Sequence, residues 1–341
     1  CFQNLLPSLR GEDRSRALYH GLAAVASDTA GWPPRFPVQP LPDGNPGLAT
    51  LKEWFRRFIM VRDAEGAERC IITALEAGAT AQEMADILFT AVTDFRYIDV
   101  GHPLDFTNKA FEALDLVGWE QAPGVLTSLI PGYAMARRME ESNAWRNPID
   151  LVDVLQAAFE QLPYALHEGA ERRGHWQGRS ELVSLLLADD PHGSVAGLLD
   201  ALRAGASPVE LAGTVAYAAA LRIARFHTSN EFGDWDTALH TFTFANGVHQ
   251  GLRRLAGYAP PEGYPLLLRG VFDAAMSVYL DRFLNIPPAR LPEPVSHTGQ
   301  APALPDLASL LDRQQQVNQA GAAVADYLFR GGDADALRAE L

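Results

Sequence analysis

The chain has 341 residues, 48% of them hydrophobic, which is enough material to bury a large core. Its formal net charge of −14 and its lack of a basic cluster argue against nucleic acid or an anionic membrane as a partner. No apolar run approaches the roughly 20 residues that span a bilayer, so we expect a soluble cytoplasmic protein that binds a small molecule.

The spacing of residue types along the chain predicts an all-α protein. Alanine, leucine and arginine recur with helical spacing, whereas alternating runs of β-branched residues are scarce. We expect one compact domain with helical repeats at 1–150 and 151–284, a proline-rich connection at 285–306 and a C-terminal helix at 307–341.

A short segment that occurs twice is the basis for expecting two pseudo-symmetric repeats. Ala74–Thr80 (ALEAGAT) matches Ala201–Ser207 (ALRAGAS). In each copy the glycine predicts a helix end, and the Thr or Ser that comes after it, with a Glu three residues later, predicts a capping box. Both copies therefore predict a helix–turn–helix unit.

The repeat also places ionisable side chains in corresponding positions. The register pairs His102 with His227, Asp105 with Asp236, and Lys109 with His240, and an earlier segment pairs His20 with His167. Two halves that face each other would bring together six nitrogen-bearing side chains, which suggests a metal site. The expected ligands are His20, His102, Lys109, His167, His227 and His240.

The position of Lys109 relative to His102 favours a shared site. Pro103 predicts that His102 lies at the beginning of a helix. Lys109 comes nearly two helical turns later, and helical side chains lean toward the helix N-terminus, so the lysine points back toward the histidine.

The available side chains limit which metals are suitable. Cys1 and Cys70 lack the spacing of a thiolate site, so nitrogen and oxygen must hold the metal. Histidine-rich sites favour Fe, Cu, Zn and Ni over Mg or Ca. Desolvation and a nearby cation lower the pKa of a lysine, and a neutral lysine can capture carbon dioxide as a carbamate, an oxygen ligand.

Two segments resemble known families. The widely spaced histidines in RALYHGLA around His20 and in VGHPLDFTNKAF around His102, with their second-half counterparts, resemble the questin oxidase-like family of non-heme iron oxygenases. That resemblance implies Fe(II), O2, an aromatic small-molecule substrate and a carboxylated lysine, a role that the repeat transfers to Lys109. The hairpin at 74–83 also resembles carboxymuconolactone decarboxylase and AhpD-like proteins, without their Cys-x-x-Cys.

In this interpretation Asp105 and Asp236 orient Lys109 and His240 from one turn away. Aromatic side chains would form the wall of an apolar pocket: Phe106, Phe111, Trp235, Phe242 and Phe244. His249, nine residues after His240, is expected on the opposite side of its helix.

Three alternatives stay open. The same cluster with Zn or Ni could serve a hydrolase, because carbamylated lysines also occur in hydrolytic sites. The repeats could form a helical scaffold for a protein partner, with incidental histidines. Asp105 and Lys109 could form an ordinary ion pair between residues one helical turn apart.

Overall fold

The structure is a computed structural model that describes residues 2–36, 38–42, 46–227, 229–258, 265–284, 288–289, 292, 303–311 and 317–340. The described residues contain helices and no strands, which confirms the all-α prediction. They form two compact units, 1–286 and 287–341, where the sequence predicted a single domain.

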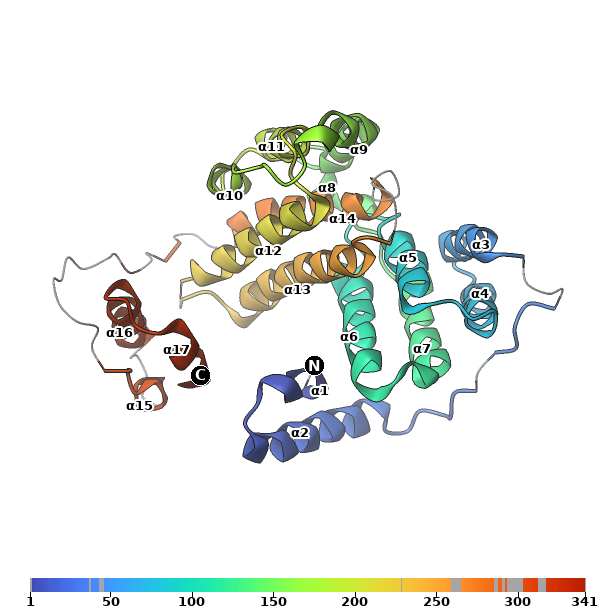
Figure 1. Ribbon diagram of the computed structural model, residues 1–341, viewed down its shortest axis with the longest axis horizontal. Helices are drawn as coiled ribbons and strands as arrows, with labels where there is room; N and C mark the ends of the chain where they lie inside the picture. Colours follow the sequence, from blue (N-terminus) through green and yellow to red (C-terminus); the bar gives the residue numbers. More distant parts are fainter. Residues whose placement is uncertain are drawn as a thin grey trace. The chain divides into compact units, whose positions relative to one another are not determined.

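The first unit begins with seven α-helices (Figure 1). They are α1 (Phe2–Leu5), α2 (Gly11–Thr29), α3 (Leu48–Met60), α4 (Ala64–Glu76), α5 (Ala81–Val92), α6 (His102–Val117) and α7 (Ala122–Met135). The remaining helices of this unit are α8 (Asn143–Arg146), α9 (Leu151–Glu168), α10 (Arg179–Leu186), α11 (Pro191–Arg203), α12 (Pro208–Ala224), α13 (Phe232–Leu255) and α14 (Pro265–Leu280).

Both predicted helix–turn–helix units are present, as α4–α5 and α11–α12. Gly78 and Gly205 adopt positive φ angles of 84° and 98° at the two turns. The amide of Ala79 donates to the carbonyl of Ala74, and the amide of Ala206 donates to that of Ala201, which is the same helix-ending bond in both copies. Capping boxes begin α5 and α12 as expected. The larger two-repeat organisation stays a prediction.

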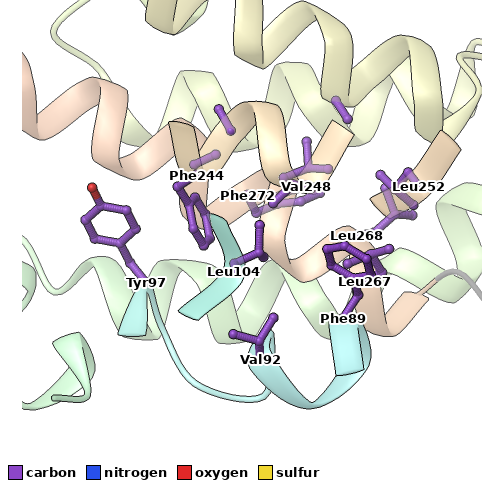
Figure 2. Close-up of a cluster of buried hydrophobic side chains, with 14 of the residues drawn as sticks. Phe89, Val92, Tyr97, Leu104, Phe244, Val248, Leu252, Leu267, Leu268 and Phe272 are labelled. Carbon is purple, nitrogen blue, oxygen red and sulfur yellow. The ribbon is translucent and has the colours of Figure 1, made fainter. Parts of the chain in front are cut away.

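The long helix α13 lies at the centre of the first unit, against α5, α6, α12 and α14. Figure 2 shows apolar side chains from α5, α6, α13 and α14 packed into one cluster, with Phe89, Leu104 and Phe244 among them. Because α6 and α13 are equivalent in the sequence register, their direct contact brings the two copies of the histidine-bearing segment together.

The second unit differs from the single C-terminal helix that the sequence predicted. It contains α15 (Leu307–Leu311), α16 (Val317–Phe329) and α17 (Ala334–Glu340), which share a small cluster of Leu307, Tyr327 and Leu337. Gly331, with φ +82°, ends α16. The carboxylate of Asp333 accepts a hydrogen bond from the amide of Asp335 in the first turn of α17. These two local signals divide the predicted helix.

Two buried carboxyls lie one after the other along α14 and its end. Asp273 is fully buried and 2.8 Å from the guanidinium of Arg96. Asp281, in the short 3₁₀ helix η7 (Asp281–Phe283), is also buried. Burial raises the pKa of Asp281 to about 7, although a hydrogen bond with Thr241 and the charge of Arg222 act in the opposite direction.

We predict that Asp281 makes the protein less stable as the pH rises from about 4 to about 7. Its pKa is about 7 in the folded chain and about 3.9 in the unfolded chain, so over this range only the folded state holds the proton. One such group contributes at most about 1.4 kcal/mol per pH unit to the decrease in unfolding free energy. Urea unfolding at several pH values should show a shallower decrease in Asp281→Asn.

Asp153→Asn is the matched control, because the Asp153 side chain is 82% exposed. This variant should follow the wild-type pH profile. Equal slopes for Asp281→Asn and the wild type would contradict the prediction.

Candidate functional site

A left-handed stretch of backbone immediately precedes α6. Tyr97, Asp99 and Val100 have φ angles of 40°, 44° and 50°, and Gly101 has one of 89°. Such angles cost a non-glycine residue on the order of 1–2 kcal/mol and need surrounding structure to hold them. The amide of Asp99 donates to the carbonyl of Arg137 at 2.8 Å. The Tyr97 ring lies between those of Trp145 and Phe244, with centroids 6.1 and 5.0 Å away.

The helices α6 and α13 approach each other closely at the beginning of α6. A Cβ atom at Gly101 would lie 2.7 Å from the Cβ of Phe244 on α13, which real side chains do not allow. On the other side of the contact, a Cβ at Gly247 would lie 2.5 Å from Leu104. Glycine on each helix therefore permits a separation that other residues would prevent.

This contact places two predicted ligands side by side. The rings of His102 and His240 have centroids 4.3 Å apart and are nearly perpendicular. The Nε2 atom of His240 lies 3.5 Å from Oδ2 of Asp236, one turn earlier on α13. The other neighbour of His102 is the ring of Phe106, stacked at 5.3 Å and more than half exposed. The histidine pair is thus half-buried, with an aromatic ring at its solvent side.

Next to the histidines, α6 carries a connected polar face. The Nζ atom of Lys109 donates to Oε2 of Glu112 at 2.9 Å, and the amide of Asn108 donates to Oε1 at 2.8 Å. From α1, the Asn4 amide also donates to Oε2, at 2.6 Å. We call His102, Asp105, Asn108, Lys109, Glu112, Asp236 and His240 the α6–α13 site.

Two oxygen atoms of this site are buried without a hydrogen-bond partner. They are Oδ1 of Asp105 and Oδ1 of Asn108. Burial raises the pKa of Asp105 and Glu112 adds to the rise, whereas Lys109, His102 and His240 act in the opposite direction. A buried acceptor oxygen without a donor or a cation lowers the stability of the fold. A cation or a hydrogen-bond donor that bound here would remove that cost.

The structure brings some of the predicted site residues together and separates others, and their role as metal ligands stays a prediction. The structure brings together His102, Asp105, Lys109, Asp236 and His240. It places His20 on the exposed face of α2, His167 in the exposed last turn of α9, and His227 in the α12–α13 connection beside Ser229. Within the described ranges no three His, Cys, Asp or Glu side chains are assembled to hold an ion, so the six-ligand site stays a prediction.

Most of the aromatic side chains that were expected to form the wall of a pocket pack in the protein interior instead. Phe111 and Phe244 are fully buried in the main hydrophobic cluster, and the Trp235 ring packs edge-on against Phe226. Phe242 is partly buried against the same cluster, whereas Phe106 stacks on His102 and is open to solvent.

Sequence reasoning missed Asn108, Glu112 and Asn4. A signal existed for the first two, because an amide and a carboxylate one turn apart interrupt an otherwise apolar helical segment. The contact from Asn4 joins residues 108 positions apart and has no local signature.

We predict that Gly101→Ala lowers the free energy of unfolding by about 3 kcal/mol or more, because it adds both a left-handed alanine and an overlap with Phe244. Gly78→Ala is the control, since Gly78 has a similar φ of 84° but nothing within 4 Å of the added Cβ. It should cost only the conformational part, about 1–2 kcal/mol. Equal losses in urea unfolding would show that the α6–α13 contact can relax.

Comparisons with known proteins leave the site without a named relative. No family model, curated protein or solved structure matches the chain. No helix among the described residues is long and apolar enough to cross a membrane.

Proposed function

We propose that the α6–α13 site binds one divalent metal ion once its side chains rearrange to bring a third ligand into place, with His102 and His240 as nitrogen ligands and Asp105 or Asp236 as the carboxylate ligand. The observation that carries this proposal is the pair of imidazoles, 4.3 Å apart, beside a buried carboxylate oxygen that has no partner. A cation among these groups would satisfy that oxygen and use the free nitrogen electron pairs of both rings.

The donor set favours particular metals. Two histidines and one carboxylate, with further positions open, form the arrangement typical of non-heme Fe(II) oxygenases. Together with the resemblance to the questin oxidase-like family, this supports an iron oxygenase that acts with O2 on an aromatic or polyketide-like small molecule. When bound, the iron would supply the electron transfer that activates O2.

The protein's own residues would position the ion and the substrate. Asp236, one turn before His240, can hold the imidazole orientation from its Nε2 side when Asp105 is the ligand. The exposed ring of Phe106, stacked on His102, offers a flat apolar surface beside the histidines against which an aromatic substrate can pack.

The contacts of Lys109 favour an ammonium over a carbamate. Its Nζ atom forms an ion pair with Glu112, and it counteracts the raised pKa of Asp105. A carboxylated lysine would place a third negative charge beside these two carboxylates. Carboxylation of Lys109 stays a prediction, and the site as folded gives the lysine a charge-balancing role.

We predict that purified protein contains iron close to one atom per chain and that His102→Gln and His240→Gln each lose most of it, because each removes one of two nitrogen ligands. His20→Gln and His167→Gln are the matched controls, since both side chains are exposed on other helices. Metal content by plasma mass spectrometry, on aerobic and anaerobic preparations, measures the result, and circular dichroism checks that each variant folds.

Each outcome has a distinct meaning. Loss of metal in the His20 or His167 variant as well would restore the six-ligand site. Zinc or nickel in place of iron would favour the hydrolase. No metal in any preparation, even after reconstitution with Fe(II), would reject the metal proposal and leave the helical scaffold.

A further inference from the structure

A hollow lies on another side of α13, against α12. It encloses about 540 Å³. The residues that line it include Trp176, Gln177, Arg179, Glu210, Thr214 and His249. His240 contacts α6, whereas His249 faces Gly213 of α12, where an added Cβ would lie 3.2 Å from its Nε2. His240 and His249 therefore lie in different surroundings. A ligand in this hollow would bind independently of any metal at the α6–α13 site.

The wall that carries Trp176 is fixed by backbone contacts. The amide of Gly174 donates to the carbonyl of Gly205 at 3.1 Å, and the amide of His175 donates to that of Arg172 at 3.1 Å. Arg179, the first residue of α10, lies over the ring of Tyr217 on α12 at 5.1 Å. These contacts hold the segment before α10 against the start of α12, so the hollow is preformed.

Several polar side chains around the hollow form no hydrogen bond, although the hydroxyl of Thr214 donates to the carbonyl of Glu210 at 2.8 Å. Among the described residues, no hydrogen bond is made by the side chains of Trp176, Gln177, Arg179 or His249. The one lining carboxylate, Glu210, is occupied, because it accepts a hydrogen bond from the Ser207 amide at 2.8 Å. The unused groups are mainly donors.

Two arginines and one carboxylate lie around the hollow. Burial lowers the pKa of His249, and the charges of Arg253 and Arg179 lower it further, so the imidazole is neutral at pH 7. Glu210 keeps its negative charge, but it already accepts a hydrogen bond, so Arg179 is the lining group that can pair with an anion.

We propose that this hollow binds a small aromatic carboxylate, with its carboxylate on Arg179 and its ring on Trp176. A guanidinium matches a carboxylate with two parallel hydrogen bonds, and an indole offers a face for stacking. Gln177 and His249 can donate to or accept from a ring substituent such as a hydroxyl group. A volume of about 540 Å³ is in the range of small-molecule sites.

The test uses the full chain and benzoate as the probe, with saturation-transfer NMR and calorimetry as the measurements. Benzoate should bind, and Arg179→Gln should weaken binding by about tenfold or more, because a charge-assisted contact is lost. Arg16→Gln is the matched control, since that side chain is 80% exposed on α2. Benzamide, which has the same ring without the charge, should bind much more weakly.

A second readout monitors His249 directly. The pKa of its ring, measured from the Cε1 proton shift, should rise when benzoate is added, because an anion beside it favours the protonated form. Metal content should stay the same in Arg179→Gln, which separates this site from the α6–α13 site.

The proposal is overturned if benzoate shows no binding up to ~10 mM. It is also overturned if benzoate binds Arg179→Gln as tightly as wild type, or if benzamide binds as well as benzoate. Trp176→Leu, checked for folding, then tests the ring contact, and an unchanged affinity for benzoate would remove that part of the proposal.

Discussion

The close packing of α13 is the constraint on which the rest of the first unit depends. This helix contacts α5, α6, α12 and α14, and it approaches two of them through glycine. A Cβ at Gly251 would lie 2.9 Å from the ring of Phe89 on α5, and one at Gly247 would overlap Leu104 on α6. Interiors pack at crystal-like density, so these contacts leave little freedom in how α13 lies or rotates. The positions of His240 and His249 result from that placement.

What the sequence could predict is what local chemistry determines. The helix ends at Gly78 and Gly205 and the capping boxes after them involve atoms within a few residues of each other, so the segments 74–83 and 201–210 are enough to specify them. The start of α6 at His102 is another such case, because Pro103 fits the first turn of a helix. The all-α class comes from the same helical periodicity, repeated along the chain.

What the sequence could not predict depends on contacts between distant segments. The register paired the segments of α6 and α13, which lie in contact, but it also implied that His20, His167 and His227 would join them. A sequence register gives no distances, and the repeat itself stays a prediction. The left-handed residues before α6 are harder still. Neither Tyr97 nor Val100 favours a positive φ, and the conformation exists because Trp145 and Phe244 enclose the Tyr97 ring. No local pattern contains that information.

Different charged side chains lie on the two sides of α13, and they constrain what each side can bind. In the α6–α13 site three carboxylates, Asp105, Glu112 and Asp236, face one lysine, and buried acceptor oxygens have no partner. An anion placed there would meet repulsion, whereas a cation would relieve it. Beside His249 the charges are mixed, because Arg179 and Arg253 lie near Glu210, which already accepts a hydrogen bond from the Ser207 amide. One helix thus separates the proposed metal site from a side on which Arg179 can pair with an organic acid.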